Sequence, residues 1–125
     1  MLSGAGGLNT SAAVTVLDNK AGALVDIQND GGFVGDGGGF ETVINAGVLR
    51  KSGGTGTSTF SSVTVSNTGA YVIEGNSGTL LVPGLTSNTG TIRTAAGGTV
   101  SNGGAALTNQ SGGVIEGSGT VSVGV

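Results

Sequence analysis

The sequence predicts an all-β protein, a parallel β-helix (β-solenoid) of about five coils, with roughly 21–22 residues and three short strands in each coil. Three observations lead to this fold class. Asn-x-Gly steps recur at a nearly constant interval, a second glycine turn follows each of them, and the segments between the turns have the length and composition of strands. Such a chain returns to the same corner in every coil, so each strand can pair with its counterpart in the next coil.

The Asn-x-Gly steps set the period. The motifs "NAG", "NTG", "NTG" and "NQSG" begin at Asn45, Asn67, Asn88 and Asn109, so the intervals between successive asparagines are almost identical. An earlier "NKAG" at 19–22 resembles the last motif, and the interval from it to Asn45 is somewhat longer than the others. Periods of this length are typical of solenoids, in which one unit cannot bury its apolar side without its neighbours.

The second turn and the strands complete each coil. The motifs "SGGT", "NSGT", "AGGT" and "GSGT" occupy 52–55, 76–79, 96–99 and 117–120. The segments between turns run to about three to five residues, are rich in Val, Ile and Thr and tend to alternate, which favours strands over helices. The predicted interior consists of stacked aliphatic side chains: Ile44, Leu49, Val63, Val65, Ile73, Leu80, Val82, Ile92, Val100, Leu107, Ile115 and Val121.

The chain is predicted to form a single domain over residues 1–125, since 125 residues suit one domain rather than two. Residues 43–125 hold the regular repeats. Residues 1–42 are expected to form irregular first coils, with the glycine-rich segment "GGFVGDGGGF" at 31–40 as an inserted loop.

The repeated corner has a physical explanation in its two residue types. Glycine adopts the positive φ angles that sharp corners can require, and asparagine tolerates them. An asparagine that recurs in every coil can also bond through its amide to the coils above and below, as in the amide ladders of cross-β structures. We therefore expect one ladder of four asparagines and four turn glycines as the structural site residues: Asn45, Asn67, Asn88, Asn109, Gly47, Gly69, Gly90 and Gly112.

Composition argues against several classes of function. The net charge of −3 and the four Lys and Arg residues give no attraction to phosphate backbones, so we expect no nucleic-acid partner. The chain has no cysteine, and no stretch approaches the roughly 20 apolar residues of a membrane-spanning helix. We expect no cofactor and no membrane insertion. The N-terminus lacks the basic and apolar regions of a secretory signal, so a signal for export would lie outside this chain.

A calcium site is one alternative for the segment 30–41. Asp30, Asp36 and Glu41 flank glycines, and β-helix repeats of the form G-G-x-G-x-D bind calcium in their turns. The third glycine is displaced here and no second copy follows, so a plain loop is the preferred interpretation and no metal is predicted.

Paired carboxylates suggest glycoside hydrolysis as a second alternative. Glu74 and Glu116 fall at equivalent places two coils apart, but Arg93 takes that place in the coil between them and Arg50 takes it one coil earlier. Charge pairing between stacked coils explains this alternation without chemistry. We therefore predict that the protein is not an enzyme.

The stretch "INAGVLRKSGGTGTSTFSSVTVSNTGAYVIEGNSGTLLV", residues 44–82, resembles the repeats of large bacterial surface proteins. These are the adhesins, the filamentous-haemagglutinin-like proteins and the passenger domains of autotransporters. The resemblance implies a parallel β-helix that is secreted or displayed on a bacterial cell surface as a stalk or binding shaft. It implies no catalytic residues.

Two functions follow as expectations. The C-terminal "GTVSVGV" is an alternating strand without a helix, a charge cluster or a proline, the usual defences of a strand edge. A solenoid that lacks a cap can stack head to tail on further copies, so we expect a non-catalytic extracellular subunit that forms a surface fibre or filament. The alternative is a shaft segment of a larger adhesin that binds a host or matrix ligand.

Overall fold

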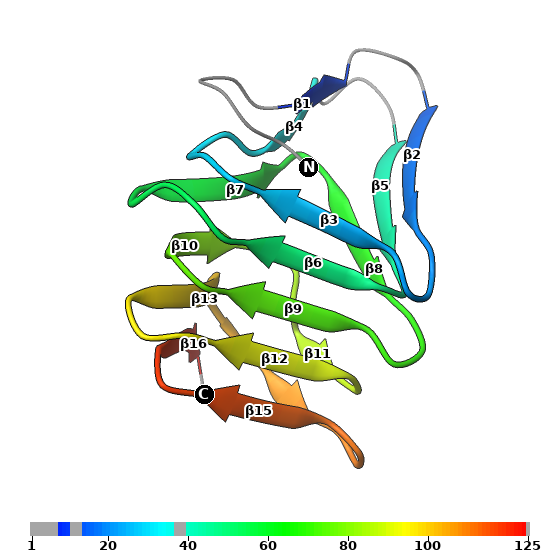
Figure 1. The fold of residues 1–125 in the computed structure, drawn as a ribbon. Helices are drawn as coiled ribbons and strands as arrows, with labels where there is room; N and C mark the ends of the chain where they lie inside the picture. Colours follow the sequence, from blue (N-terminus) through cyan, green and yellow to red (C-terminus); the bar gives the residue numbers. More distant parts are fainter. Residues whose placement is uncertain (1–7, 11–13, 37–39, 125) are drawn as a thin grey trace.

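The computed structural model describes residues 8–10, 14–36 and 40–124, and it confirms the predicted fold class. The described chain winds into a parallel β-solenoid of five coils, and its strands stack in successive layers along one axis (Figure 1). The described residues include no helix. No long apolar helix of the kind that crosses a bilayer therefore occurs among them.

Each of the five coils gives one strand to each of three faces, and one additional strand precedes them on the third face. The first face holds β2 (Val14–Asn19), β5 (Phe40–Asn45), β8 (Thr64–Asn67), β11 (Ser87–Asn88) and β14 (Thr108–Asn109). The second face holds β3 (Leu24–Ile27), β6 (Val48–Lys51), β9 (Val72–Gly75), β12 (Thr91–Thr94) and β15 (Val114–Gly117). The third face holds β1 (Leu8–Thr10), β4 (Phe33–Gly35), β7 (Thr57–Ser61), β10 (Gly78–Leu81), β13 (Gly98–Ala106) and β16 (Thr120–Gly124).

The three faces differ in continuity. All pairings between neighbouring coils are parallel, and the second and third faces are unbroken sheets of five and six strands. The first face is divided into a sheet β2-β5-β8 and a sheet β11-β14. The solenoid is therefore continuous on two sides and interrupted on the third, between its third and fourth coils.

Two kinds of corner link the first face to the second. Strands of the second face begin at Leu24, Val48, Val72, Thr91 and Val114, which are equivalent in register. These starts lie five residues after Asn19, Asn67 and Asn109 but three residues after Asn45 and Asn88. Long and short corners thus alternate from coil to coil. This alternation is not visible in the asparagine spacing, which is nearly uniform. It appears only in the spacing of the strand starts, where the interval from Val72 to Thr91 is the shortest.

The core is a narrow stack of apolar side chains along the axis. Six predicted core residues are fully buried: Leu49, Ile73, Leu80, Val82, Ile92 and Val100. Four more are partly buried against that stack: Val63, Val65, Leu107 and Val121. Ile27, Val43 and Leu85 join them. Stacked aliphatic side chains therefore fill the interior, as the repeat pattern predicts.

Two of the predicted core positions are wrong. Asn45 is fully buried, and successive residues of a strand face opposite sides, so Val43 points inward and Ile44 outward. Ile115 does continue the inward-facing row, in register with Ile92, but it belongs to the last coil and is 44% exposed.

Three aromatic side chains, those of Phe33, Phe60 and Tyr71, lie in the core, although the composition suggested few large rings there. Phe33 and Phe60 are buried and stack with ring centroids 4.8 Å apart, and Tyr71 is 1% exposed. Phe33 lies on β4, inside the segment 31–40 that the glycines identify as an inserted loop. That prediction is corrected for residues 33–35, which pair with β1 and β7, while 37–39 lie outside the described residues.

Candidate functional site: the asparagine corner, the lateral cleft and the open coil

Asparagine side chains stack at the corner between the first and second faces. Asn19 Nδ2 donates to Asn45 Oδ1 at 2.8 Å, and Asn45 Nδ2 donates to Asn67 Oδ1 at 3.2 Å. In the last two coils Asn88 Nδ2 donates to Asn109 Oδ1 at 2.8 Å. The expected bonds 45–67 and 88–109 form, but the expected bond between Asn67 and Asn88 does not, and Asn19 joins the ladder without having been predicted. The asparagines thus form two separate ladders, 19–45–67 and 88–109, rather than one.

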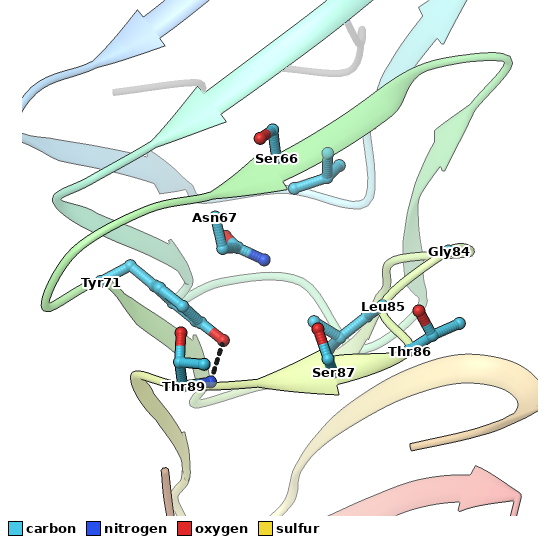
Figure 2. A pocket seen from close by; sticks show the side chains of 9 residues that line it. Ser66, Asn67, Tyr71, Gly84, Leu85, Thr86, Ser87 and Thr89 are labelled. Carbon is cyan, nitrogen blue, oxygen red and sulfur yellow. Dashed lines mark hydrogen bonds between the residues drawn. The ribbon is translucent and has the colours of Figure 1, made fainter. Parts of the chain in front are cut away.

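The break between the two ladders is occupied by Tyr71. Its hydroxyl donates to Asn88 Oδ1 at 2.7 Å, which is the bond that Asn67 Nδ2 would make in a continuous ladder. The same hydroxyl accepts from the backbone N–H of Thr89 at 3.2 Å (Figure 2). At the neighbouring corners the equivalent N–H groups, those of Thr68 and Gln110, donate to the backbone carbonyl of the asparagine one coil earlier. One phenol group thus replaces two contacts of Asn67.

Register explains why a tyrosine can enter the ladder here. Tyr71 directly precedes β9, the position that Gly47 and Gly90 occupy before β6 and β12. It lies at a long corner, whose two extra residues form the turn around Gly69. The side chain from this corner reaches down to the next coil, at the place where β8 and β11 do not pair with each other.

A lateral cleft of about 220 Å³ opens at this break (Figure 2). It is lined by Val65, Ser66, Asn67, Tyr71, Gly84, Leu85, Thr86, Ser87 and Thr89. Val65 is half-buried, whereas Val43 at the same register position one coil earlier is 2% exposed. The cleft therefore gives solvent access to side chains that the other coils enclose. We name this hollow the lateral cleft.

Because the asparagine ladder is interrupted after Asn67, the side-chain amide of this residue lacks, among the described residues, the acceptors that the other ladder amides have. Asn19, Asn45 and Asn88 each donate two hydrogen bonds from Nδ2, one to the next asparagine and one to a backbone carbonyl of the second face. Asn67 Nδ2 has no hydrogen-bond partner within the described part of the chain, and its nitrogen points into the lateral cleft (Figure 2). Nothing in the sequence indicates this unpaired amide, because Asn67 has nearly the same spacing from its neighbours as the other asparagines of the repeat.

The predicted turn glycines divide between two roles. Gly69 and Gly112, at long corners, have φ angles of +64° and +86° and face open space. Gly47 and Gly90, at short corners, do not have positive φ angles, which corrects the expectation for these two. A Cβ at Gly47 would lie 2.3 Å from the carbonyl oxygen of Ala23, and one at Gly90 would lie 2.5 Å from that of Tyr71. Short corners therefore require glycine because they nest against the long corner of the preceding coil.

Charged residues form a second ladder, on the second face. Arg50 binds Asp26 through Nη2 at 2.9 Å and Nε at 3.2 Å, and Arg93 binds Glu74 at 3.0 Å and Glu116 at 2.7 Å. Arg50 also lies 4.0 Å from Glu74. The hydrogen bonds from Arg50 lower the pKa of Asp26 from 3.8 to about 2, against the opposing effect of burial. Both carboxylates of the glycosidase alternative are thus engaged by Arg93, as the charge-pairing interpretation predicts.

The segment considered for calcium is organised around a lysine instead. Lys51 is fully buried, and its ammonium donates to Asn29 O, Gly53 O and Asp30 Oδ1 at 2.5, 2.7 and 3.0 Å. This pairing with Lys51, together with the backbone N–H of Gly56, lowers the pKa of Asp30. A buried ammonium is tolerated because all three of its protons are bonded. Among the described residues no three potential ligands gather in a metal-binding group.

Glu41, the third acid of that segment, lies apart from Asp30. It is 4% exposed on β5, and neither carboxylate oxygen has a hydrogen-bond partner in the described part of the chain. A Cβ added at Gly35 on β4 would lie 3.1 Å from this carboxyl group. The sequence offered no sign that this acid would point inward.

The last of the described coils has no further coil over its core side among the described residues. Ile115 and Val121 continue the inward rows of Ile92 and Val100, which are both 0% exposed. Ile115 is 44% exposed, and β14, β15 and β16 are the outermost strands of their sheets (Figure 1). Their outer backbone edges and the apolar side chains between them form one surface, which we call the open coil.

Comparisons with protein-family models, with curated proteins and with solved structures find no match to this chain.

Proposed function

We propose that the protein is a non-catalytic structural rod whose open coil stacks on another coil of the same kind, building an extracellular fibre from successive copies. The observation that carries the proposal is the exposure of Ile115, an inward-facing residue whose counterparts in the two preceding coils are fully buried. Burying such a side chain contributes about 1.5–3 kcal/mol, so an uncovered row of them favours association.

The polar groups of the open coil also support stacking of a further coil. A parallel strand edge offers unpaired backbone groups to any further strand in the correct register, and a head-to-tail contact of this kind does not close on itself. Asn109 Oδ1 accepts from Asn88, while Asn109 Nδ2 bonds only within its own corner, to Gly113 O at 2.9 Å. A further coil could thus extend the asparagine ladder as well as the sheets.

A secreted or cell-surface location, in a bacterium, is part of this proposal. Its support is the resemblance of residues 44–82 to repeats of bacterial surface proteins. The absence of catalysis is also proposed rather than measured. It is supported by the engagement of Glu74 and Glu116 in the charge ladder, which leaves neither carboxylate of that pair unbound.

The test is a pair of substitutions on adjacent residues of β15. Ile115 and Val114 are 44% and 43% exposed but point to opposite faces of the strand, inward and outward. We expect purified wild-type chain to form regular fibres in electron micrographs, Ile115→Asp to remain as single short rods, and Val114→Asp to form fibres like the wild type. Circular dichroism of each variant checks that the β-structure persists.

Two results would contradict the proposal. Wild-type protein that stays monodisperse at high concentration would exclude stacking between copies. Fibres that form equally well from Ile115→Asp would place the contact somewhere other than the open coil.

A shaft segment of a larger adhesin is the second candidate, and the same open coil favours it. Further coils of one longer chain would cover Ile115 as well as a second copy would. A chain extended by more repeats beyond Val125, monomeric and with Ile115 protected from hydrogen exchange, would support this candidate over the fibre.

A further inference from the structure

We propose that the lateral cleft binds a single neutral sugar unit, or a polyol of similar size. The proposal rests on the interruption of the first face and is independent of end-to-end stacking. The cleft lies on the side of the rod between the third and fourth coils, away from the open coil.

The polar lining of the lateral cleft suits a ligand with many hydroxyl groups. Asn67 Nδ2 offers hydrogen-bond donors that nothing in the described chain accepts, whereas the amides of Asn19, Asn45 and Asn88 each donate two hydrogen bonds. The hydroxyls of Thr86, Ser87 and Thr89 face the amide from the opposite side of the cleft (Figure 2). Each of these hydroxyls can donate and accept, which is the pattern that a ring of adjacent hydroxyls requires.

The apolar part of the lining is small and lies at the inner end of the cleft. Val65 and Leu85 both belong to the core cluster or pack against it, and Leu85 is 3% exposed. Little apolar surface therefore faces a ligand, and the hydroxyls of a sugar meet the amide and the Ser and Thr side chains. A purely apolar ligand would leave the Asn67 donors without a partner, at a cost of about 1–3 kcal/mol.

The charge of the lining and the volume of the cleft restrict the class of ligand further. No charged residue lines the lateral cleft, so an anion or cation would lose its hydration without gaining a counter-ion. The volume of about 220 Å³ lies below the roughly 300–1,000 Å³ typical of pockets for drug-sized ligands. One ring therefore fits better than an oligomer or a nucleotide, and any longer glycan would enter by one terminal unit.

The experiment is an NMR titration of the ¹⁵N-labelled Ile115→Asp chain, or of the wild type if it does not assemble. The probes are the methyl glycosides of glucose, galactose, mannose and N-acetylglucosamine, with glucuronate and inorganic phosphate as charged probes. We expect saturable shifts at the Asn67 side-chain amide and at the backbone of Ser87 and Thr89 for at least one neutral glycoside. The expected dissociation constant is on the order of 1 mM.

Matched variants locate the binding. Ser87 and Thr108 are equivalent in register and exposed, but only Ser87 lines the cleft. We expect Ser87→Phe to raise the dissociation constant about tenfold or more and Thr108→Phe to leave it unchanged. Asn67→Asp keeps an acceptor for Asn45 and removes the donors, so it should also weaken binding of the neutral probe about tenfold.

Three outcomes would overturn the proposal. The first is no saturable shift with any neutral glycoside, which would leave a cleft that holds solvent alone. The second is stronger binding of glucuronate or phosphate at the same residues. The third is binding that Ser87→Phe does not weaken, which would place the site elsewhere. None of these results bears on fibre formation.

Discussion

At the scale of single residues, Tyr71 has the widest effect on the architecture. Its hydroxyl satisfies Asn88 and the backbone of Thr89, and through these two bonds it holds the fourth coil beneath a third coil whose strand β8 does not reach it. The ring is 1% exposed, so the hydroxyl must find its partners inside the protein. The lateral cleft beside it exists because this side chain, and not a strand pairing, joins the two coils there.

Replacing Tyr71 by phenylalanine tests this role. Tyr71→Phe keeps the ring and leaves Asn88 Oδ1 unpaired, and Asn88 is 0% exposed. An unsatisfied buried acceptor costs about 1–3 kcal/mol, so the free energy of unfolding from urea titration should fall by about that amount. An unchanged urea midpoint would mean that water in the cleft takes over both bonds.

Asp26 gives the protein a defined sensitivity to acid. Its pKa is about 2 in the folded chain, below the ordinary value of 3.8, because Arg50 binds its carboxylate. A lowered folded-state pKa contributes stability that is fully present above about pH 4 and is lost as the pH falls toward 2. We expect the thermal midpoint to drop across this window in the wild type and to change less in Asp26→Asn. Parallel curves for the two proteins would show that the carboxylate does not titrate with folding.

At the scale of elements, the corners decide how coils fit together. A long corner turns through a glycine of positive φ that faces solvent, and a short corner lays its glycine against the carbonyl oxygens of the long corner before it. The two classes therefore depend on glycine for different reasons, a backbone angle in one and close approach in the other.

Alanine substitutions should separate the two reasons. Gly69→Ala places a side chain at a φ of +64° in open space and should cost about 1–2 kcal/mol. Gly47→Ala places a Cβ 2.3 and 2.5 Å from two backbone oxygens, so two coils must move apart and the loss of stability should be clearly larger. Gly69→Asn should recover part of the loss because asparagine tolerates this angle, whereas Gly47→Asn should not. Equal losses for the two alanine variants would contradict the distinction.

Much of this element-level organisation could be predicted from the chain alone, and the reasons for the rest are specific. The asparagine period and the alternation of Arg and Glu follow from residues that recur at one register position, so they are visible in a sequence. The direction of individual side chains is not. Ile44 and Val43 are both aliphatic, so the sequence does not tell which of them faces inward. Glu41 and Lys51 are charged residues at inward positions, where apolar residues are expected. The inward position of Tyr71 depends on the two extra residues of its corner, which the Asn-x-Gly motif does not reveal.

At the scale of the whole molecule, we expect the stability of the described coils to differ with the number of coils packed against each. The core residues of β9 and β12 have a coil on each side, whereas those of β15 have one. In a solenoid each coil contacts only its neighbours, so opening begins at an exposed end. On the second face, the strands of the inner coils are therefore paired with a neighbouring coil on both sides, whereas β15 is paired on one side.

Hydrogen exchange should report this gradient. In the Ile115→Asp chain we expect amides of β15 to exchange faster than their register partners in β12 and β9. In assembled wild-type protein, β15 should become as protected as β12 because a further coil covers it. Uniform protection in the unassembled chain would instead mean that the five coils open as one cooperative unit.

The alternation of corners also bears on how such a chain can change length. A short corner fits only against a long one, so removing or copying a single coil brings two like corners together. Two neighbouring short corners lack the wide turn that accommodates their glycines, whereas the turn glycines of long corners, Gly69 and Gly112, face open space. Duplicating a single short-cornered coil should therefore destabilise the rod, whereas an added coil with a long corner should be tolerated.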